Sequence, residues 1–442
     1  MSRQLFGTDG VRGRAGEFLT AELALALSRA TVELCEEAHP QVLIVRDTRE
    51  SGEMLEAAIA AGATAAGGDV LLGGVLPTPA APLLVRRHGL HLAAVISASH
   101  NPYEDNGIKF FAADGFKLSD ETEVAIEQQM LNRGRRPDRI GHVRRMQGAF
   151  EDYVHVLHTR FADLDLSGTR VLLDCAHGAT FRVAPEIFRR LGAEVDVLAD
   201  SPDGRNINAG VGSTHIERLA ETMARGEHAL GFAFDGDGDR VLAVDCHGHV
   251  VDGDELIALT AMHYKRTGRL DGGGVAVTVM TNYGFHTAMD EAGIDVTTTA
   301  VGDRYVNEAL RARGWRLGGE QSGHIIDLGF GPSGDGIASG LLTLEALAGA
   351  DLAERHAMRK LPQRLVNLRA ASREALVSAM QAAAVTQAIA AADQALTGRG
   401  RVLVRASGTE PLIRVMVEAP SQEETESRVA ELCRVVEEAL AG

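Results

Sequence analysis

Three aspartates alternate with glycines in the segment DGDGDR at residues 235–240. Apolar runs on both sides, 229–234 and 241–244, predict two strands joined by this segment. Alternate residues of an extended chain point to the same side, so the three carboxylates should converge and require a cation. An EF-hand is excluded, because its sixth position would be Arg240 and its twelfth Cys246. Three oxygens beside an arginine are typical of Mg²⁺ bound together with a phosphate.

A serine follows the apolar run 92–96, in the segment SASHNP at residues 97–102. Ser99 lies beside His100 and near Lys109, so it could act as an activated nucleophile. The G-x-S-x-G pattern of hydrolases is absent, so that template has no local support. A turn held by hydroxyl-to-backbone bonds is the alternative for this stretch in isolation.

A glycine-flanked loop carries Glu320, Ser322 and His324 in the segment GEQSGH at residues 319–324. A carboxylate and a hydroxyl two residues apart can bind neighbouring hydroxyls of a sugar. Loops with one acid among glycines are common, so this signal is weak alone.

A second loop, RASGTEP at residues 405–411, is suited to an anion. It offers small residues with free backbone N–H groups between two arginines. Its candidate phosphate-binding residues are Arg405, Ser407, Gly408, Thr409 and Arg414. The spacing of an NTP-binding P-loop is absent, which excludes that class.

Two further segments carry a cation, GTDGVRG at 7–13 with Arg12 and GDR at 302–304 with Arg304. A formal G-x-G-x-x-G at 329–334 contains a proline and is interpreted as a turn. Charge-assisted bonds from such local cations contribute roughly 1.5–3 kcal/mol each. An anionic small molecule is therefore compatible with an acidic chain.

The composition excludes several classes of function. The 442 residues include 44 Lys and Arg against 61 Asp and Glu, a net charge of −17, which argues against a nucleic-acid or anionic-membrane partner. The four cysteines have no paired spacing and indicate reduced thiols. We find no signal peptide and no run of about 18 apolar residues, so a cytoplasmic protein is expected.

The elements that must position these residues repeat three times. Predicted strands at 42–45, 170–174 and 274–279 are each followed by a helix and a Gly-x-acid-Val turn that opens another strand. The tail differs: we predict strands at 364–369, 401–405 and 412–419 and helices at 374–396 and after the capping box Ser421…Glu424. The sequence thus predicts three related α/β domains and an antiparallel α+β module, with a hinge near residues 361–362.

Together these motifs resemble those of the α-D-phosphohexomutase superfamily, in the same order and over essentially the whole chain. The matching segments are FGTDGVRG, SASHNPYEDNGIKFF, DGDGDR, VGDRYV, GEQSGH and RASGTEPLIRVMVEA. The resemblance implies three related mixed α/β domains and a C-terminal α+β domain around a central cleft. The expected boundaries are 1–150 with the phosphoserine loop, 151–250 with the metal loop, 251–363 with the sugar-binding loop and 364–442 with the phosphate-binding loop.

Gln321 in GEQSGH matches the subfamily that interconverts glucosamine 6-phosphate and glucosamine 1-phosphate. The resemblance then implies a phosphoserine enzyme, a bisphosphorylated sugar intermediate and a place before UDP-N-acetylglucosamine and peptidoglycan synthesis. It also implies that Ser99 is phosphorylated and, with Asp235, Asp237 and Asp239, binds one Mg²⁺. Partners other than the phosphosugar are not expected, although family members are often homodimers.

The residues expected to act on the sugar fall into two groups. The expected catalytic residues are Ser99, His100, Lys109, Arg240 and His324. The expected substrate-binding residues are Arg12, Arg304, Glu320, Ser322, Arg405, Ser407, Gly408, Thr409 and Arg414. Either Lys109 or His324 would transfer the proton. The rival interpretations are a phosphomannomutase/phosphoglucomutase, a sugar-phosphate-binding protein without activity and a metal-dependent phosphatase.

Overall fold

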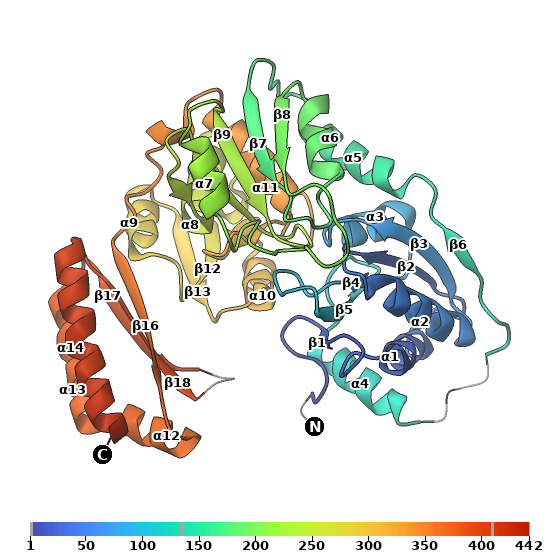
Figure 1. Cartoon of the computed structure of the whole chain (residues 1–442), viewed down its shortest axis with the longest axis horizontal. Helices are drawn as coiled ribbons and strands as arrows, with labels where there is room; N and C mark the ends of the chain where they lie inside the picture. The colour runs from blue at the N-terminus through green and yellow to red at the C-terminus, as the bar shows by residue number, and fades with distance from the viewer. Residues whose placement is uncertain (1–2, 133, 135–136, 408–410, 442) are drawn as a thin grey trace. The chain divides into compact units, whose positions relative to one another are not determined.

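The computed structural model describes residues 3–132, 134, 137–407 and 411–441 (Figure 1). Its contacts divide the chain into two compact units. The first contains Met1–Val279 and Thr297–Arg355, and the second contains Met280–Val296 and His356–Gly442. All residues of the metal, serine and sugar loops belong to the first unit.

The first sheet has the strand order β1-β5-β4-β2-β3-β6 and mixes parallel with antiparallel pairs. Its strands are β1 Val11–Arg14, β2 Gln41–Arg46, β3 Asp69–Val75, β4 Leu92–Ile96, β5 Asp105–Ala112 and β6 Val143–Arg145. The accompanying helices are α1 Ala21–Glu33, α2 Gly52–Ala65, α3 Ala80–His88 and α4 Asp120–Met130. Buried Leu27 of α1, Ile59 of α2 and Ile44 of β2 share one core. The serine loop leaves the end of β4, which this core holds in place.

The second sheet has the order β11-β10-β9-β7-β8. Its strands are β7 Arg170–Asp174, β8 Glu194–Leu198, β9 Leu230–Phe234, β10 Val241–Asp245 and β11 Val250–Val251, and its helices are α5 Ala149–Arg160, α6 Val183–Arg190 and α7 Glu217–Met223. β9 and β10 are antiparallel, with Phe234 opposite Val241. The acidic segment 235–240 is therefore the turn of a buried hairpin, as the flanking apolar runs predict.

The third sheet has the order β13-β12-β14-β15. Its strands are β12 Gly274–Thr278, β13 Asp295–Thr299, β14 Leu317–Gly319 and β15 Ile325–Asp327. The helices in this part are α8 Gly253–Arg266, α9 Tyr283–Glu291, α10 Asp303–Arg313 and α11 Gly336–Leu347, with short 3₁₀ helices at Asp271–Gly273 and Leu352–Glu354. The sugar loop is the connection between the antiparallel strands β14 and β15.

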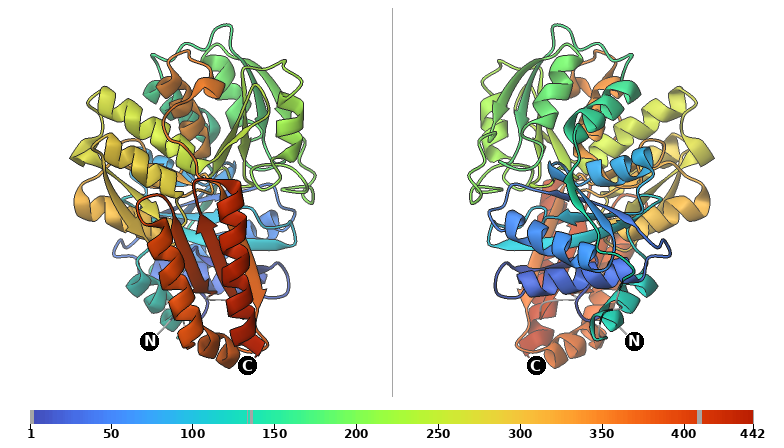
Figure 2. Two further views of the ribbon diagram at one scale, coloured as in Figure 1. Left: turned by 90° about the vertical axis from the view of Figure 1, so that its left-hand side faces the viewer. Right: turned by 90° about the vertical axis from the view of Figure 1, so that its right-hand side faces the viewer.

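The C-terminal sheet is antiparallel, as predicted, and its strand order is β16-β18-β17. Its strands are β16 Gln363–Arg369, β17 Arg401–Ala406 and β18 Leu412–Glu418, and its helices are α12 Arg373–Gln381, α13 Ala383–Leu396 and α14 Gln422–Ala441. Figure 2 shows α13 and α14 side by side over one face of this sheet. Ser421 caps α14 by accepting a bond from the amide of Glu424.

The prediction of one helix over 374–396 is wrong. Ala382 has an extended ψ of 132°, which separates α12 from α13. The break allows Leu376 of α12 and Val385 of α13 to enter the same core. Among the described helices, none has by itself the length and apolar composition of a membrane span; only the bent pair α12–α13 has them jointly.

Helix α9 belongs to the second unit, although its sequence lies among the elements of the third sheet. The amide of Tyr283 donates to Glu418 Oε2 at 2.7 Å. Asn282 exchanges two hydrogen bonds with the backbone of Leu361, at 3.0 and 2.9 Å. The domain boundaries expected from the sequence stay a prediction. Residues 280–296 lie within the expected third domain, but their contacts group them with residues 356–442.

Asp335 caps helix α11 beside the metal loop. Its carboxylate accepts bonds from the amide of Ala338 at 2.9 Å and from the hydroxyl of Tyr153 at 2.8 Å. The amide of Gly336 donates to the carbonyl of Gly238, which connects this helix end to the aspartate turn. Burial raises the pKa of Asp335 to about 6, although the two hydrogen bonds oppose the rise.

We expect Asp335→Asn to stabilise the protein above pH 6 but not near pH 4. In the unfolded chain the carboxyl ionises near pH 4, whereas in the folded protein it ionises near pH 6. The folded state therefore loses stability between these values, by up to roughly 3 kcal/mol. Thermal unfolding of both proteins at pH 4 and pH 7 measures the difference. Asp163→Asn, at an exposed position, is the control; a pH-independent effect of Asp335→Asn would contradict the assignment.

Candidate active site

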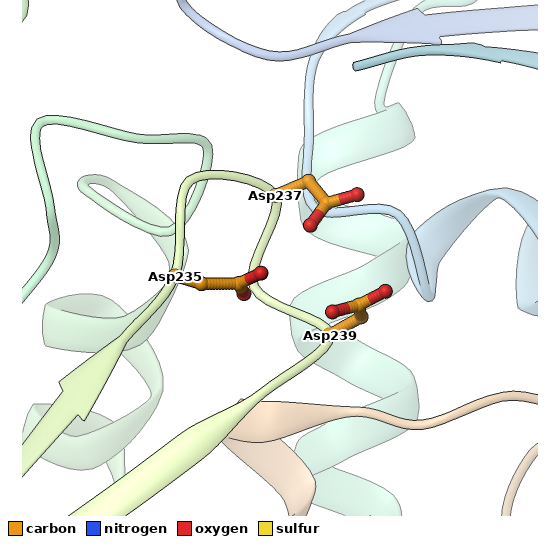
Figure 3. A group of neighbouring side chains, drawn as sticks. All are labelled: Asp235, Asp237 and Asp239. Carbon is orange, nitrogen blue, oxygen red and sulfur yellow. The ribbon is translucent and has the colours of Figure 1, made fainter. Parts of the chain in front are cut away.

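The three aspartates of the β9–β10 turn are buried and converge as their spacing predicts. Asp235, Asp237 and Asp239 each offer a carboxylate oxygen, and these oxygens lie within 4.8 Å of one another. Figure 3 shows the three carboxyl groups directed toward a common space beside the turn. Asp237 Oδ1 is buried and has no hydrogen-bond partner among the residues that the structure describes. An unsatisfied carboxylate oxygen in such a group is suited to a hard divalent cation.

The turn cannot hold three negative charges without compensation. Burial and the neighbouring Asp239 and Asp237 raise the pKa of Asp235 well above its usual value. Burial would also raise the pKa of Asp239, but His324 and Lys109 lower it. Asp235 therefore holds a proton more readily than Asp239 does. A bound divalent cation would replace that proton as the compensating charge.

Ser99 reaches the metal turn from the end of β4. Its hydroxyl donates to Asp235 Oδ2 at 2.5 Å, and its own amide donates to Ser97 Oγ at 2.9 Å. The backbone of Ser99 has a φ of 53°, which a residue with a side chain rarely adopts. This conformation turns the hydroxyl toward the aspartates, so the structure brings together the predicted nucleophile and the predicted metal ligands.

Two residues of the first sheet region fix Asp237. The hydroxyl of Thr78 donates to Asp237 Oδ2 at 2.6 Å, and the amide of Thr78 donates to the backbone carbonyl of Asp237 at 2.8 Å. The ammonium of Lys109 lies 3.1 Å from Asp237 Oδ2 and 2.9 Å from Asp9 Oδ2. Burial alone would lower the pKa of Lys109, but Asp237, Asp9 and Asp239 raise it well above its usual value. Lys109 is therefore held as a cation.

Lys117 connects two carboxylates at the cavity. Its ammonium lies 2.5 Å from Asp9 Oδ1 and 2.6 Å from Asp303 Oδ2. Burial would lower the pKa of Lys117, but the two carboxylates raise it. Asp9 belongs to the N-terminal turn and Asp303 begins α10, so this lysine joins the first and third sheet regions.

His324 completes the wall of the site. Its Nδ1 lies 3.6 Å from Asp239 Oδ1, and its Nε2 lies 3.6 Å from Asp303 Oδ2. Burial would lower the pKa of His324, but the carboxylates of Asp239, Asp303 and Glu320 raise it to about 9. The amide of Gly334 donates to Nε2 at 3.2 Å, a hydrogen bond that requires Nε2 to carry no proton.

A cavity of about 400 Å³ opens in front of these groups. It is lined by Leu5, Gly7, Thr8, Asp9, Gly10, Arg12, His100, Asp239, Arg240, Val301, Gly302, Asp303, Glu320 and His324. A larger cavity of about 920 Å³, around Arg160 and Glu345, contains none of the predicted site residues. We assign the chemistry to the smaller cavity, because the predicted metal and sugar loops meet there.

One side of the cavity is formed by the cations Arg12 and Arg240 together with His100. Arg12 donates to the carbonyl of Ala98 at 3.2 Å and pairs with Asp9. Arg240 Nη1 lies 3.3 Å from His100 Nδ1. Burial, with Arg240 and Arg12 close by, lowers the pKa of His100 to about 4. His100 is consequently neutral at physiological pH.

Not every predicted substrate residue lies at this cavity. Ser322 is exposed and does not line it. Arg304 pairs with Asp120 and with Glu123 Oε1, the latter at 3.0 Å, and does not line the cavity either. The substrate roles of both residues stay predictions.

The predicted phosphate loop lies in the C-terminal unit. Arg405 and Arg414 are directly opposite each other on β17 and β18, where like charges are unfavourable without an anion. Burial and Arg414 lower the pKa of Arg405. Ser407 follows β17, whereas Gly408 and Thr409 lie outside the described residues.

Sequence reasoning missed several residues that hold this site together: Asp9, Arg49, Thr78, Lys117, Asn208 and Asp303. Asp9 and Asp303 lie inside the noted segments GTDGVRG and GDR, so their carboxylates could have been considered. Arg49, Thr78, Lys117 and Asn208 carry no local pattern that marks them.

Comparisons with known proteins agree with this geometry. Four successive segments match the four domains of the phosphoglucomutase/phosphomannomutase family: α/β/α domain I at residues 3–136, domain II at 151–248, domain III at 252–365 and the C-terminal domain at 365–435. These domains define a phosphohexomutase, an isomerase. The chain belongs to the phosphoglucomutase/phosphomannomutase family.

Two similar proteins are named phosphoglucosamine mutase. The one from Moorella thermoacetica is 51% identical, over 98% of this chain and 99% of its own. The one from Aeromonas hydrophila is 46% identical over the whole of both chains. In fold, the chain resembles a phosphoglucomutase/phosphomannomutase family protein from Burkholderia thailandensis, with a TM-score of 0.82 and 24% identity over 99% and 98% of the two chains. An N-acetylphosphoglucosamine mutase from Aspergillus fumigatus has a TM-score of 0.69 and 17% identity over 99% and 96%.

We expect Asp237→Asn to abolish stabilisation by divalent cations. Mg²⁺ at 100 times its dissociation constant should stabilise the wild-type protein by about 2.7 kcal/mol. The variant lacks one ligand charge, so its melting temperature should respond little to the same Mg²⁺ titration. The exposed variant Glu227→Gln should respond as the wild type does. An undiminished response in Asp237→Asn would remove this aspartate from the metal site.

Proposed function

We propose that this protein interconverts glucosamine 6-phosphate and glucosamine 1-phosphate through phosphorylated Ser99 and a bisphosphorylated sugar. The observation that carries the proposal is the 2.5 Å contact between the Ser99 hydroxyl and Asp235 of the metal turn. It places a hydroxyl that can hold phosphate beside a set of ligands for one Mg²⁺. The names of the similar proteins support glucosamine phosphate as the substrate.

The reaction consists of two phosphoryl transfers that balance each other. In the first, a sugar hydroxyl attacks the phosphorus on Ser99; the new P–O bond forms, the bond to Ser99 Oγ breaks and the hydroxyl proton passes to a base. In the second, Ser99 Oγ accepts the phosphoryl group from the other end of the sugar, and that oxygen receives a proton. The enzyme thus ends phosphorylated, and the sugar keeps one phosphate.

The residues present fit a divalent cation, with Asp235, Asp237, Asp239 and phosphorylated Ser99 as its ligands. Mg²⁺ bound there would stabilise negative charge on the phosphoryl group during transfer. Arg240, which lines the cavity beside these groups, adds a donor for the same oxygens. This arrangement favours phosphoryl transfer within the cavity.

For the proton we favour His324 over Lys109. Both are buried, but His324 lines the cavity, whereas Lys109 is not among its lining residues and bonds to the carboxylates of Asp9 and Asp237. A group that exchanges a proton with the sugar must be within reach of its hydroxyl. Lys109 would instead hold Asp9 and Asp237 in position.

The sugar itself would bind to the polar walls. Glu320 faces the cavity as an acceptor for hydroxyl groups, and Arg12 is a donor for phosphate. Asp9 and Asp303 also line the cavity, and although Lys117 pairs with both, their oxygens are acceptors for the ammonium group of glucosamine. Arg405, Ser407 and Arg414 would hold the phosphate group that does not react.

The reaction is placed in the cytoplasm, where it would precede the formation of UDP-N-acetylglucosamine for peptidoglycan. The place of the reaction before UDP-N-acetylglucosamine is what the resemblance of the motifs implies. A homodimer stays a prediction, which size-exclusion chromatography tests directly.

Ser99→Ala should abolish interconversion and leave the fold intact, because alanine keeps the backbone but offers no oxygen for phosphate. Intact-mass spectrometry of active wild-type enzyme should show one added phosphate, which the variant lacks. Loss of activity with an unchanged melting temperature is the expected result. An active preparation without phosphate on Ser99 would count against the mechanism.

The substrate is tested by comparing kcat/KM on glucosamine 1-phosphate, glucose 1-phosphate and mannose 1-phosphate. We expect the highest value on glucosamine 1-phosphate. Preference for mannose or glucose phosphate would indicate a phosphomannomutase/phosphoglucomutase instead. Steady release of inorganic phosphate would indicate a phosphatase, and tight binding without exchange a binding protein.

A further inference from the structure

The backbone around Ser99 turns two carbonyl groups away from the cavity. These are the carbonyls of Ser99 and Asn101, and two side chains from distant parts of the sequence donate to both. Arg49 Nη2 lies 3.2 Å from Ser99 O and 2.6 Å from Asn101 O. Asn208 Nδ2 lies 2.9 and 3.0 Å from the same two oxygens. The loop is thus held by a pair of donors.

Arg49 supplies the donor from the first sheet region. Its side chain is fully buried and pairs with Asp47, whose other oxygen accepts the amide of Arg49 at 2.9 Å. A buried guanidinium is stable only when its charge and its N–H groups are matched. Asp47 compensates the charge, and the carbonyls of Ser99 and Asn101 accept from Nη2, whereas Nε has no hydrogen-bond partner among the described residues. The two Nη2 bonds connect the serine loop to this buried arginine.

Asn208 supplies the donor from the second sheet region. It is 6% exposed, and its φ of 59° suits asparagine better than most residues. Its own amide donates to the carbonyl of Ala176 at 2.9 Å, which fixes it behind β7. Asn208 therefore joins the serine loop to the domain that carries the aspartates.

The metal turn is packed against the same carbonyl. A Cβ at Gly236 would lie 2.5 Å from Ser99 O and 2.8 Å from Asn208 Nδ2. Glycine at this position lets Asp235 and Asp237 approach the serine. Any shift of the Ser99 carbonyl would therefore also shift the contact between Ser99 Oγ and Asp235.

Other contacts join the same two regions farther from the serine. Thr48 donates to the carbonyl of His177 at 2.6 Å, and Arg205 pairs with Glu50 at 2.7 Å. The regions thus have connections that do not touch Ser99. Asn208 is accordingly expected to affect the position of Ser99 more than the stability of the fold.

We propose that Arg49 and Asn208 are positioning residues for phosphoryl transfer, which hold the Ser99 backbone in its left-handed conformation from two domains at once. This inference rests on the proposed function. It requires that loss of the Asn208 donor displace the serine relative to the aspartates. Misplacement of a reacting atom by about 1 Å lowers a rate roughly a hundredfold.

The test compares Asn208→Gly, which tolerates the positive φ, with Asn206→Gly in the same loop. Among the described residues, Asn206 bonds only within its own loop, at Asp203, Ser201 and Ala209. We expect Asn208→Gly to lower kcat roughly ten- to a hundredfold, with KM within twofold of the wild type. Transfer of phosphate from glucose 1,6-bisphosphate to Ser99, followed by intact mass, should slow by the same factor. Asn206→Gly should retain wild-type kcat.

A second pair of variants controls for the possibility that Asn208→Gly does not fold. Asn208→Asp keeps the size and the backbone preference but replaces the donor with an acceptor, and should slow Ser99 phosphorylation equally. Arg205→Met removes a contact between the same regions at an exposed site and should not. Wild-type kcat in a folded Asn208 variant, or an equal loss in Arg205→Met, would overturn the inference. Wild-type protein that neither accepts phosphate on Ser99 nor turns over would instead contradict the proposed function.

Discussion

The site depends on the alternation of buried positive and negative groups. Two lysines and a histidine separate three aspartates in a closed ring: Lys109, Asp9, Lys117, Asp303, His324 and Asp239. Taking one member from such a ring leaves a neighbouring charge buried without compensation, which is costly. The members of the ring come from three sheet regions. The same ion pairs therefore hold these regions together and form the wall of the cavity.

The ring compensates two of the three metal-turn aspartates and leaves the third. Lys109 contacts Asp237 and Asp239, whereas Asp235 bonds to the hydroxyl of Ser99. Among the described residues, Asp235 forms no ion pair, so its negative charge beside Ser99 is the least compensated of the three. If another lysine formed an ion pair with Asp235, its ammonium group would occupy the position that a divalent cation needs.

The sequence predicts the features that depend on local spacing. The hairpin at 235–240 follows from apolar runs on both sides, and the antiparallel pairing of β17 with β18 follows from two adjacent strands joined by a short loop. Arg49, Asn208 and Lys117 could not be predicted, because their partners lie 50, 109 and 186 residues away. The break at Ala382 could not be predicted either, because neither glycine nor proline marks it. It allows α12 and α13 to pack into one core.

The grouping of α9 with the tail has a consequence for how the molecule can be divided. Glu418 is fully buried, and its carboxylate is shared by the amide of Tyr283 and the side chains of Arg401 and Gln363. A fragment beginning at His356 would lose the amide and leave part of a buried anion unsolvated. A tail fragment that keeps this anion fully bonded must therefore carry residues 280–296 as well, joined to residue 356 by a linker in place of residues 297–355.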